Sequence, residues 1–132
     1  MSNSFNTKTG AKAVTLVDAA KNPQYTDPIY AENMLTVSGS VEATLTVGQQ
    51  LTGAIYLQGS NELGNETPGI GTTTVTNWVS VGSSLISGTA GVVIYSLSTT
   101  DFAYRWLRFG YVPDAAASGG IEGHLRFTIK GW

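Results

Sequence analysis

The chain has 132 residues and a mass of 13.9 kDa, a length typical of one domain. It has no cysteine, which excludes disulfides, zinc–thiolate sites and cysteine nucleophiles. Charged residues make up 12% of the chain, against about 25% in a typical domain, which argues against a typical soluble enzyme. The formal net charge of −2 argues against bulk nucleic acid as a partner.

Residues 1–40 are predicted to form an extended arm and connection. Residues 1–10 are polar and lack periodicity, so we expect them to be disordered alone and ordered by a partner. Residues 12–20 fit either an edge strand or a short helix. Residues 23–30 contain two prolines and two tyrosines, which favours an extended segment that wraps its own domain or reaches a neighbour. We expect this segment to be the strap between subunits of a symmetric homo-oligomer.

A β-hairpin is predicted over residues 41–57. Apolar and polar residues alternate over residues 41–47 and again over 51–57, on either side of a short turn at residues 48–50. The apolar residues keep the same phase across the turn, as register in a hairpin requires. The residues placed on the inner face are Val41, Ala43, Leu45, Val47, Leu51, Gly53, Ile55 and Leu57.

Further short strands follow, separated by segments rich in glycine, asparagine, proline and threonine. The expected strands span residues 78–81, 92–98, 104–111 and 121–130, with a Gly/Ser turn after the first. No segment favours a helix longer than a turn or two. Residues 41–132 are therefore predicted to form an all-β domain, an antiparallel β-sandwich of jelly-roll-like type. Its core is expected to include Val41, Leu45, Ile55, Leu57, Val93, Leu107, Phe109, Leu125, Phe127 and Ile129.

The last two strands are predicted to pair as an antiparallel hairpin, with partner numbers that sum to about 232. Trp106 then lies opposite Arg126, and Arg108 lies opposite His124, with Glu122 on the diagonal. A guanidinium over an indole contributes about 0.5–1 kcal/mol at an exposed site. The pattern therefore predicts a preorganised aromatic–arginine surface for protein–protein contact, unless another strand or loop of the same domain covers it.

Residues that could catalyse a reaction or hold a ligand are few. His124 is the one histidine, and no G-x-S-x-G motif is present, so a hydrolase triad is not indicated. The Gly69-Ile70-Gly71 segment lacks the lysine of a phosphate-binding loop, and residues 61–66 lack the spacing of a calcium loop. Nine acidic residues leave glycoside cleavage by paired carboxylates formally open, but no spacing brings two of them together. We therefore expect no catalytic residue, no cofactor and no metal site.

Several short segments show a resemblance to a known family. They are residues 52–61 (TGAIYLQGSN), Trp78-Val79, residues 87–91 (SGTAG), residues 106–109 (WLRF) and a glycine-rich C-terminal end. Together, over about residues 40–132, they resemble the small β-sandwich cement, or decoration, proteins of tailed-bacteriophage capsids. The resemblance implies a non-enzymatic virion protein on the outer capsid surface. Such a protein bridges subunits of the major capsid protein and commonly acts as a small homo-oligomer.

The candidate interface residues come from the arm, the strap and the aromatic–arginine surface. They are Phe5, Tyr25, Tyr30, Tyr104, Trp106, Arg108, His124 and Arg126. The sequence has no secretion signal and no run of eighteen apolar residues. We therefore expect synthesis in the host cytoplasm, no membrane or nucleic-acid partner, and a final place on the virion.

A carbohydrate- or receptor-binding β-sandwich, such as a tail-fibre tip domain, is the alternative. In that case Tyr56, Trp78 and Trp106 would stack on sugar rings. Glycan-dependent tryptophan fluorescence would favour this alternative, whereas co-sedimentation with capsids would favour the decoration protein.

Overall fold

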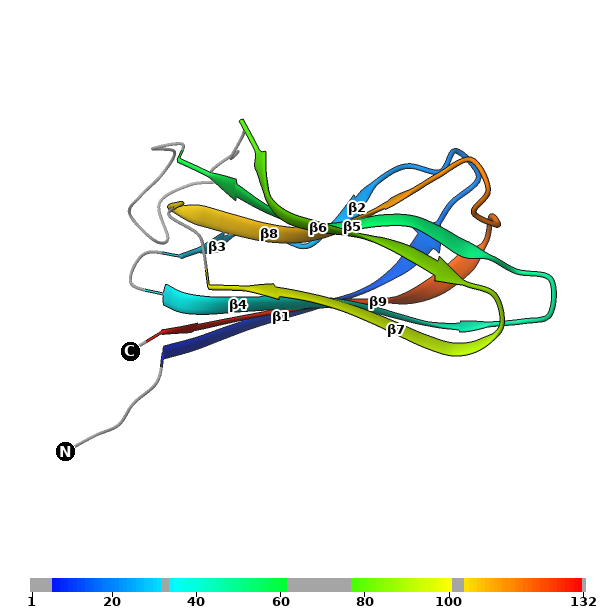
Figure 1. Cartoon of the computed structure of the whole chain (residues 1–132), viewed down its shortest axis with the longest axis horizontal. Helices are drawn as coiled ribbons and strands as arrows, with labels where there is room; N and C mark the ends of the chain where they lie inside the picture. The colour runs from blue at the N-terminus through cyan, green and yellow to red at the C-terminus, as the bar shows by residue number, and fades with distance from the viewer. Residues whose placement is uncertain (1–5, 32–33, 62–76, 101–103, 132) are drawn as a thin grey trace.

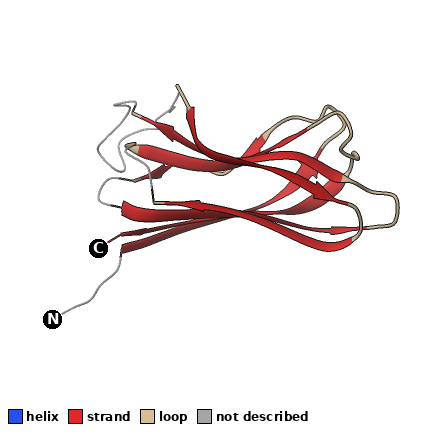
Figure 2. Ribbon diagram, viewed as in Figure 1, coloured by secondary structure: helices blue, strands red, loops and turns tan. Residues whose placement is uncertain are grey.

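The structure is a computed structural model that describes residues 6–31, 34–61, 77–100 and 104–131. Every regular element in this part of the chain is a β-strand (Figure 2). The strands form two antiparallel sheets that pack face to face, as Figure 1 shows. This arrangement confirms the all-β, antiparallel β-sandwich that the alternation of apolar and polar residues predicts.

Each sheet contains strands that are far apart in the sequence. The strands of sheet A, in spatial order, are β1 (Asn6–Val17), β9 (Ile121–Gly131), β4 (Met34–Leu45) and β7 (Gly91–Thr99). The strands of sheet B, in order, are β2 (Gln24–Tyr25), β8 (Trp106–Pro113), β5 (Leu51–Ser60) and β6 (Val79–Gly88). A further short strand, β3 (Ile29–Tyr30), also pairs with β8.

The strand pairings are nested along the chain. β1 pairs with β9, β2 with β8, β4 with β7, and β5 with β6. The pairings of β4 with β9 and of β5 with β8 then join these pairs into the two sheets. Nested antiparallel pairing over two packed sheets is the topology of a jelly roll, so the jelly-roll prediction is confirmed.

The core lies between the inner faces of the two sheets. Along β9, the side chains of Leu125, Phe127 and Ile129 are buried, whereas Arg126 and Lys130, which point to the other face, are exposed. This alternation is the one that a half-buried strand produces, because successive side chains point to opposite faces. Of the residues predicted for the core, all are buried except Val93, which is half-buried against the core.

The predicted hairpin over residues 41–57 is wrong. β4 and β5 are consecutive but lie in different sheets, so the turn between them crosses from one sheet to the other. Val47, predicted to face the core, is 98% exposed in this turn, whereas Leu45 and Leu51 on either side are buried as predicted. A connection between sheets keeps the apolar residues of both strands facing the core, as a hairpin does. Alternation therefore does not distinguish the two arrangements.

The predicted final hairpin is wrong for the same reason. β8 lies in sheet B and β9 in sheet A, so the loop between them also crosses between sheets. In this loop the Asp114 carboxylate accepts hydrogen bonds from the backbone N–H groups of Ala116 and Ala117, at 2.9 and 3.1 Å, and Ala117 is buried. The outer faces of β8 and β9 therefore lie on opposite sides of the molecule.

β1 brings the N-terminal segment into the fold. It pairs with β9 along its length. Residues 12–17, for which the sequence left an edge strand or a short helix open, therefore belong to an edge strand. Residues 6–10, predicted to be disordered, lie in this strand, and that part of the prediction is wrong. Residues 1–5 lie outside the described residues. The sandwich thus includes residues before position 41, and the boundary predicted there falls within β4.

β6 is longer than predicted. The Gly/Ser turn expected after residue 81 is a continuous part of the strand, which extends to Gly88. β7 then begins at Gly91, whose φ of 74° lies in the left-handed region that favours glycine. The connection between the two sheets is therefore confined to residues 89–90.

Candidate protein interface

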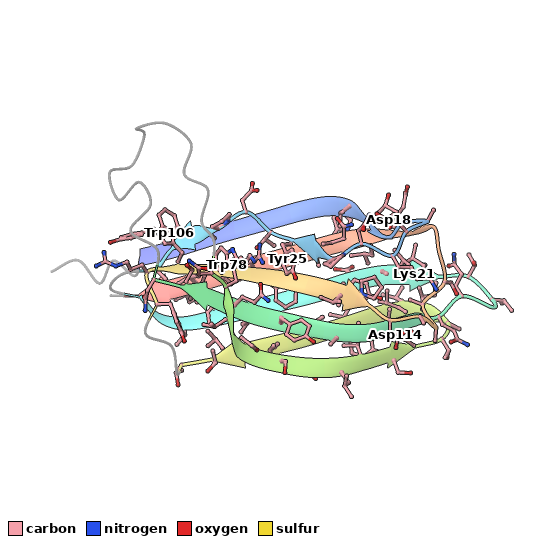
Figure 3. All side chains as sticks on the ribbon, turned by 90° about the horizontal axis from the view of Figure 1, so that it is seen from above. Asp18, Lys21, Tyr25, Trp78, Trp106 and Asp114 are labelled. Carbon is pink, nitrogen blue, oxygen red and sulfur yellow. The ribbon has the colours of Figure 1, made fainter. Side chains whose placement is uncertain are left out.

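The outer face of sheet B holds five half-buried residues that form what we call the aromatic–arginine cluster. Its members are Tyr25 of β2, Tyr30 of β3, Trp78 just before β6, and Trp106 and Arg108 of β8. Figure 3 shows Tyr25, Trp78 and Trp106 gathered toward one end of the sheet, away from Asp18, Lys21 and Asp114.

Arg108 is the centre of the cluster. Its guanidinium carbon lies 3.7 Å from the centroid of the Tyr25 ring and 4.3 Å from that of the Trp78 ring. Its Nε donates a hydrogen bond to Gln58 Oε1 at 2.8 Å. Among the described residues, no carboxylate forms an ion pair with Arg108. Burial lowers the pKa of Arg108, but an arginine remains protonated at neutral pH. The cluster therefore presents a positive guanidinium that is stacked on two aromatic rings and hydrogen-bonded to the Gln58 amide.

Trp106 is covered by a residue of its own chain. Its ring contacts Tyr30 edge to face, with ring centroids 5.1 Å apart and an interplanar angle of 69°. The Trp106 Nε1 is buried and finds no hydrogen-bond acceptor in the described part of the chain. The alternative in which another strand covers the predicted surface is therefore correct for this residue.

The segment 23–30 reaches the cluster because it is bound to β8. Tyr25 lies opposite Gly110 and Tyr30 opposite Trp106 in the two short pairings. Between them, Thr26 is buried, its N–H donates to the Phe109 carbonyl at 2.8 Å, and its Oγ1 accepts from the Phe109 N–H at 3.0 Å. The segment thus wraps its own sandwich, which is one of the two arrangements that the sequence leaves open.

Gly110 makes room for this covering segment. A Cβ at Gly110 would lie 2.1 Å from the Cδ1 of Tyr25, a distance that side chains do not tolerate. Because Gly110 has no side chain, the Tyr25 ring can lie over this position of β8, beside Arg108.

The structure divides the predicted interface residues between three places. Tyr25, Tyr30, Trp106 and Arg108 meet in the cluster, as described above. Tyr104 instead packs against the core, next to Gly59. The other predicted members are His124 and Arg126, which are exposed on the outer face of sheet A, and Phe5, which lies outside the described residues. The predicted pairs of Trp106 with Arg126 and of Arg108 with His124 are wrong, because their strands lie in different sheets.

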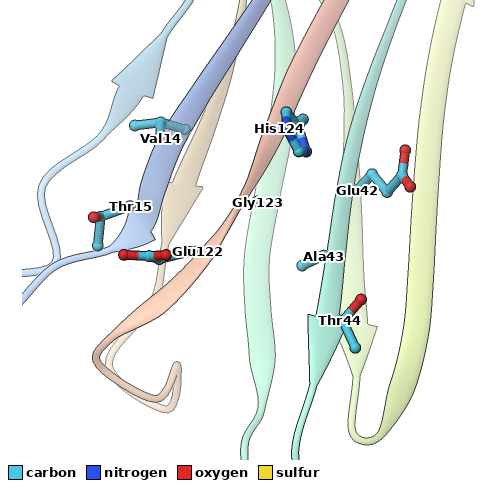
Figure 4. Close-up of a pocket in the computed structure, with 8 residues that line it drawn as sticks. All are labelled: Val14, Thr15, Glu42, Ala43, Thr44, Glu122, Gly123 and His124. Carbon is cyan, nitrogen blue, oxygen red and sulfur yellow. The ribbon is translucent and has the colours of Figure 1, made fainter.

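The outer face of sheet A has a groove around His124 (Figure 4). Glu42 and Glu122 also line it, but their carboxylates point in opposite directions and neither is aimed at the imidazole. Arg126 lies 3.6 Å from the Glu42 carboxylate in an exposed ion pair. Within the described ranges, no three His, Cys, Asp or Glu residues are close enough to hold a metal ion. The groove thus lacks an oriented carboxylate–imidazole pair of the kind that general acid–base catalysis uses.

The charged residues at the other end of sheet B hold loops in place. Asp18 accepts hydrogen bonds from the backbone and side chain of Asn22, at 2.9 and 3.2 Å, and these lower its pKa. Asp114 accepts a hydrogen bond from the Thr52 hydroxyl at 2.6 Å, which is the main reason that its pKa is lowered. These carboxylates are engaged within the chain and have a structural role.

Two members of the site were missed or assigned elsewhere. Gln58 gave no signal beyond its outward phase in a predicted strand, and its bond to Arg108 depends on the neighbouring positions of β5 and β8. Trp78 was expected only as a sugar-stacking residue. It is distant from both Tyr25 and Arg108 in the sequence, so no local pattern indicates its contact with Arg108.

Comparisons with known proteins identify no family for this chain. No protein family matches the chain, and no curated protein matches it. A solved structure from the Bacillus endospore appendages, described as a family of disulfide-linked pili, matches with a TM-score of 0.48 and 16% identity, over 96% of this chain and 87% of that one. No helix capable of spanning a membrane occurs in the part of the chain that the structure describes.

Proposed function

We propose that this chain is a non-enzymatic virion protein that binds the outer surface of a bacteriophage capsid and bridges its major capsid subunits. The family is suggested by the sequence resemblance over about residues 40–132. The observation that supports a binding role most directly is the aromatic–arginine cluster, in which Arg108 is held between two rings and has no carboxylate of its own among the described residues.

A cluster of this composition suits a protein partner. Tryptophan, tyrosine and arginine are the residues that most often dominate the energy of protein–protein interfaces. Stacking on Tyr25 and Trp78, together with the bond to Gln58, already restricts the rotamers of Arg108. Little conformational entropy is then lost when a carboxylate or carbonyl of the partner accepts hydrogen bonds from the terminal guanidinium nitrogens.

A shell offers many copies of the same surface. One contact of moderate strength per subunit is then sufficient, because several contacts that engage together multiply their effect. The low charge of the chain, 12% of residues, also limits the cost of removing water from the rest of the contact.

Carbohydrate binding has less support from the geometry. The Trp78 ring is stacked on Arg108 and the Trp106 ring contacts Tyr30 edge to face, so two of the three expected platforms are already engaged within the chain. A glycan-binding site of this kind normally offers an open aromatic face.

Virus particles from the source culture provide the first test. Quantitative mass spectrometry and electron microscopy should find the chain on the outer shell, in a fixed ratio to the major capsid protein. Its presence only at fibre tips, together with a tryptophan fluorescence change on adding glycans, would support the carbohydrate-binding alternative. Its absence from the particles would refute the proposal.

The docking face is tested by adding purified protein to particles stripped of it and measuring how much sediments with them. Arg108→Gln should lower the apparent affinity at least about tenfold, as a central arginine of an interface does. Arg126→Gln on the outer face of sheet A is the matched control and should bind like the wild type. Equal binding by both variants would show that the cluster is not the docking face.

A further inference from the structure

β6 and β7 together form one edge of the sandwich, which we call the β6–β7 edge (Figure 1). Within the described residues, β7 is the last strand of sheet A and pairs only with β4, and β6 is the last strand of sheet B and pairs only with β5. Their outward backbone N–H and C=O groups therefore face away from both sheets. Such a row of groups is a template for another strand.

Nothing in the sequence of this edge blocks pairing. Residues 79–99 contain no charged residue and no proline. Large apolar side chains are exposed there, with Leu85 of β6 exposed by 85% and Val92 and Ile94 of β7 by 66% and 60%. Monomeric proteins normally protect an edge with lysine, proline, a bulge or a very short strand.

The opposite edge has the usual protection. In sheet A it is β1, whose sequence includes Lys8 and Lys12, and whose pairing with β9 has an irregularity near its end. In sheet B it consists of β2 and β3, which have two residues each and are flanked by Pro23 and Pro28. The opposite edge is thus closed to further strands. On the β6–β7 edge, the pairing of β6 with β5 is irregular near Leu57, whereas β7 pairs with β4 without a register shift, so β7 is the strand that is open to a further strand.

We propose that two copies of this chain pair through β7, antiparallel about a two-fold axis, to form a dimer in which sheet A is continuous. The inference concerns a surface other than the aromatic–arginine cluster and does not depend on the proposed function.

A second copy is the occupant that fits this edge. A strand without charge offers nothing to attract a charged partner, and a second β7 brings no like charge to repel it. Two-fold symmetry lets the same strand satisfy the backbone groups of both copies. The axis runs perpendicular to the sheet, so Val92 and Ile94 of the two copies share one outer face, and β6 of each copy faces β6 of the other.

The proposal predicts a concentration-dependent dimer of the full chain. Sedimentation equilibrium or light scattering should give a mass that rises toward twice 13.9 kDa as the concentration increases. A chain that remains monomeric up to about 1 mM would overturn the proposal, since a dissociation constant above that value is too weak for a specific dimer.

Ile94→Lys tests the surface itself. Two like charges would then meet across the axis, and the dissociation constant should rise at least about tenfold. Because Ile94 is 60% exposed, the variant should keep the wild-type melting temperature within a few degrees, which circular dichroism checks. Val47→Lys changes an exposed valine of the β4–β5 turn in the same way and should leave the dimer intact. An Ile94→Lys protein that dimerises like the wild type would place the interface elsewhere.

Hydrogen exchange locates the contact independently of any variant. Amides in residues 91–99 should exchange more slowly at concentrations where the dimer forms than at dilutions where it does not. Amides of β1 should exchange at the same rate under both conditions. Protection that appears in β1 and not in β7 would overturn the proposed pairing.

Discussion

The two outer faces of the sandwich differ in how firmly their side chains are held by contacts within the chain. Sheet B is extended at one edge by the segment that contains β2 and β3, whose Tyr25 and Tyr30 rings lie beside Arg108 and Trp106 on its outer face. Sheet A carries exposed polar residues, and the ion pair between Arg126 and Glu42 on its outer face is long and open to water. The same fold thus builds one preorganised face and one that is merely solvated.

The difference originates in a few positions of β8. Gly110 lets Tyr25 approach the strand, and the Thr26 hydrogen bonds with Phe109 fix the covering segment in register. β9, the equivalent strand of sheet A, also has a strand on each side, but its outward residues His124, Arg126 and Lys130 are exposed. An ordered surface therefore requires aromatic side chains that reach it from a neighbouring strand and a small residue that leaves room for them, beyond the presence of aromatic and basic residues.

Large truncations beneath the two faces should have equal effects. Leu107 of β8 and Leu125 of β9 are both fully buried, on the inner sides of the two sheets. Leu107→Ala and Leu125→Ala should each lower the free energy of unfolding by about 2–5 kcal/mol, measured by urea denaturation. A large difference between them would mean that the asymmetry of the faces extends into the core.

Filling the space between Gly110 and the Tyr25 ring should disturb the outer face of sheet B selectively. Gly110→Ala places a methyl group on the Tyr25 ring, and we expect a loss of about 3 kcal/mol in the free energy of unfolding, together with a change in tryptophan fluorescence as the cluster is disturbed. Gly82→Ala is the control. Its Cβ would meet only the methyl groups of Leu97, at 3.9 and 4.0 Å, so stability should change by less than about 1 kcal/mol. Equal losses would show that Gly110 has no special role.

How far the sequence leads is clearest on these same strands. The phase of β8 and β9 follows from alternation, because burial of one face fixes which residues point inward, and Leu107, Phe109, Leu125 and Phe127 are buried as predicted. The partner of each strand does not follow. Trp106 pairs with Tyr30, which is seventy-six positions away, whereas a short loop suggested a hairpin with β9.

The composition of the candidate site was therefore predicted in part, and its arrangement was not. Trp106 and Arg108 were placed on an outer face, which is correct, but their neighbours are Tyr30 and Tyr25 and not Arg126 and His124. In a jelly roll the strands that are consecutive often lie in opposite sheets, and no local residue pattern records this.

The two arginines offer a direct comparison of the faces. Arg108→Ala removes two cation–π contacts and a hydrogen bond to Gln58 from a half-buried site, and it should lower the free energy of unfolding by about 1–2 kcal/mol. Arg126→Ala removes an exposed ion pair with a distance of 3.6 Å and should cost about 0–0.5 kcal/mol. If the two losses are equal, the stacking of Arg108 contributes nothing to the fold.

A smaller loss than that of Arg108→Ala is expected at Tyr111, on the inner side of the strand that carries Arg108. Tyr111 is buried, and its hydroxyl donates a hydrogen bond to the Thr52 carbonyl at 2.7 Å. Tyr111→Phe keeps the ring and removes that bond, so the free energy of unfolding at pH 7 should fall by about 1 kcal/mol.

The pH dependence of the same variant tests the cause. Burial, with a smaller contribution from the charge of Asp114, raises the pKa of Tyr111 above its ordinary value of 10.0. The folded state then holds the proton more tightly than the unfolded chain, so this contribution to stability is complete below about pH 10 and is lost progressively as the pH rises above it. Urea unfolding from pH 7 to pH 11 should show the wild type losing stability more steeply above pH 10 than Tyr111→Phe. Parallel curves would mean that Tyr111 titrates equally well in the folded state, and hence that the inner side of β8 is open to water.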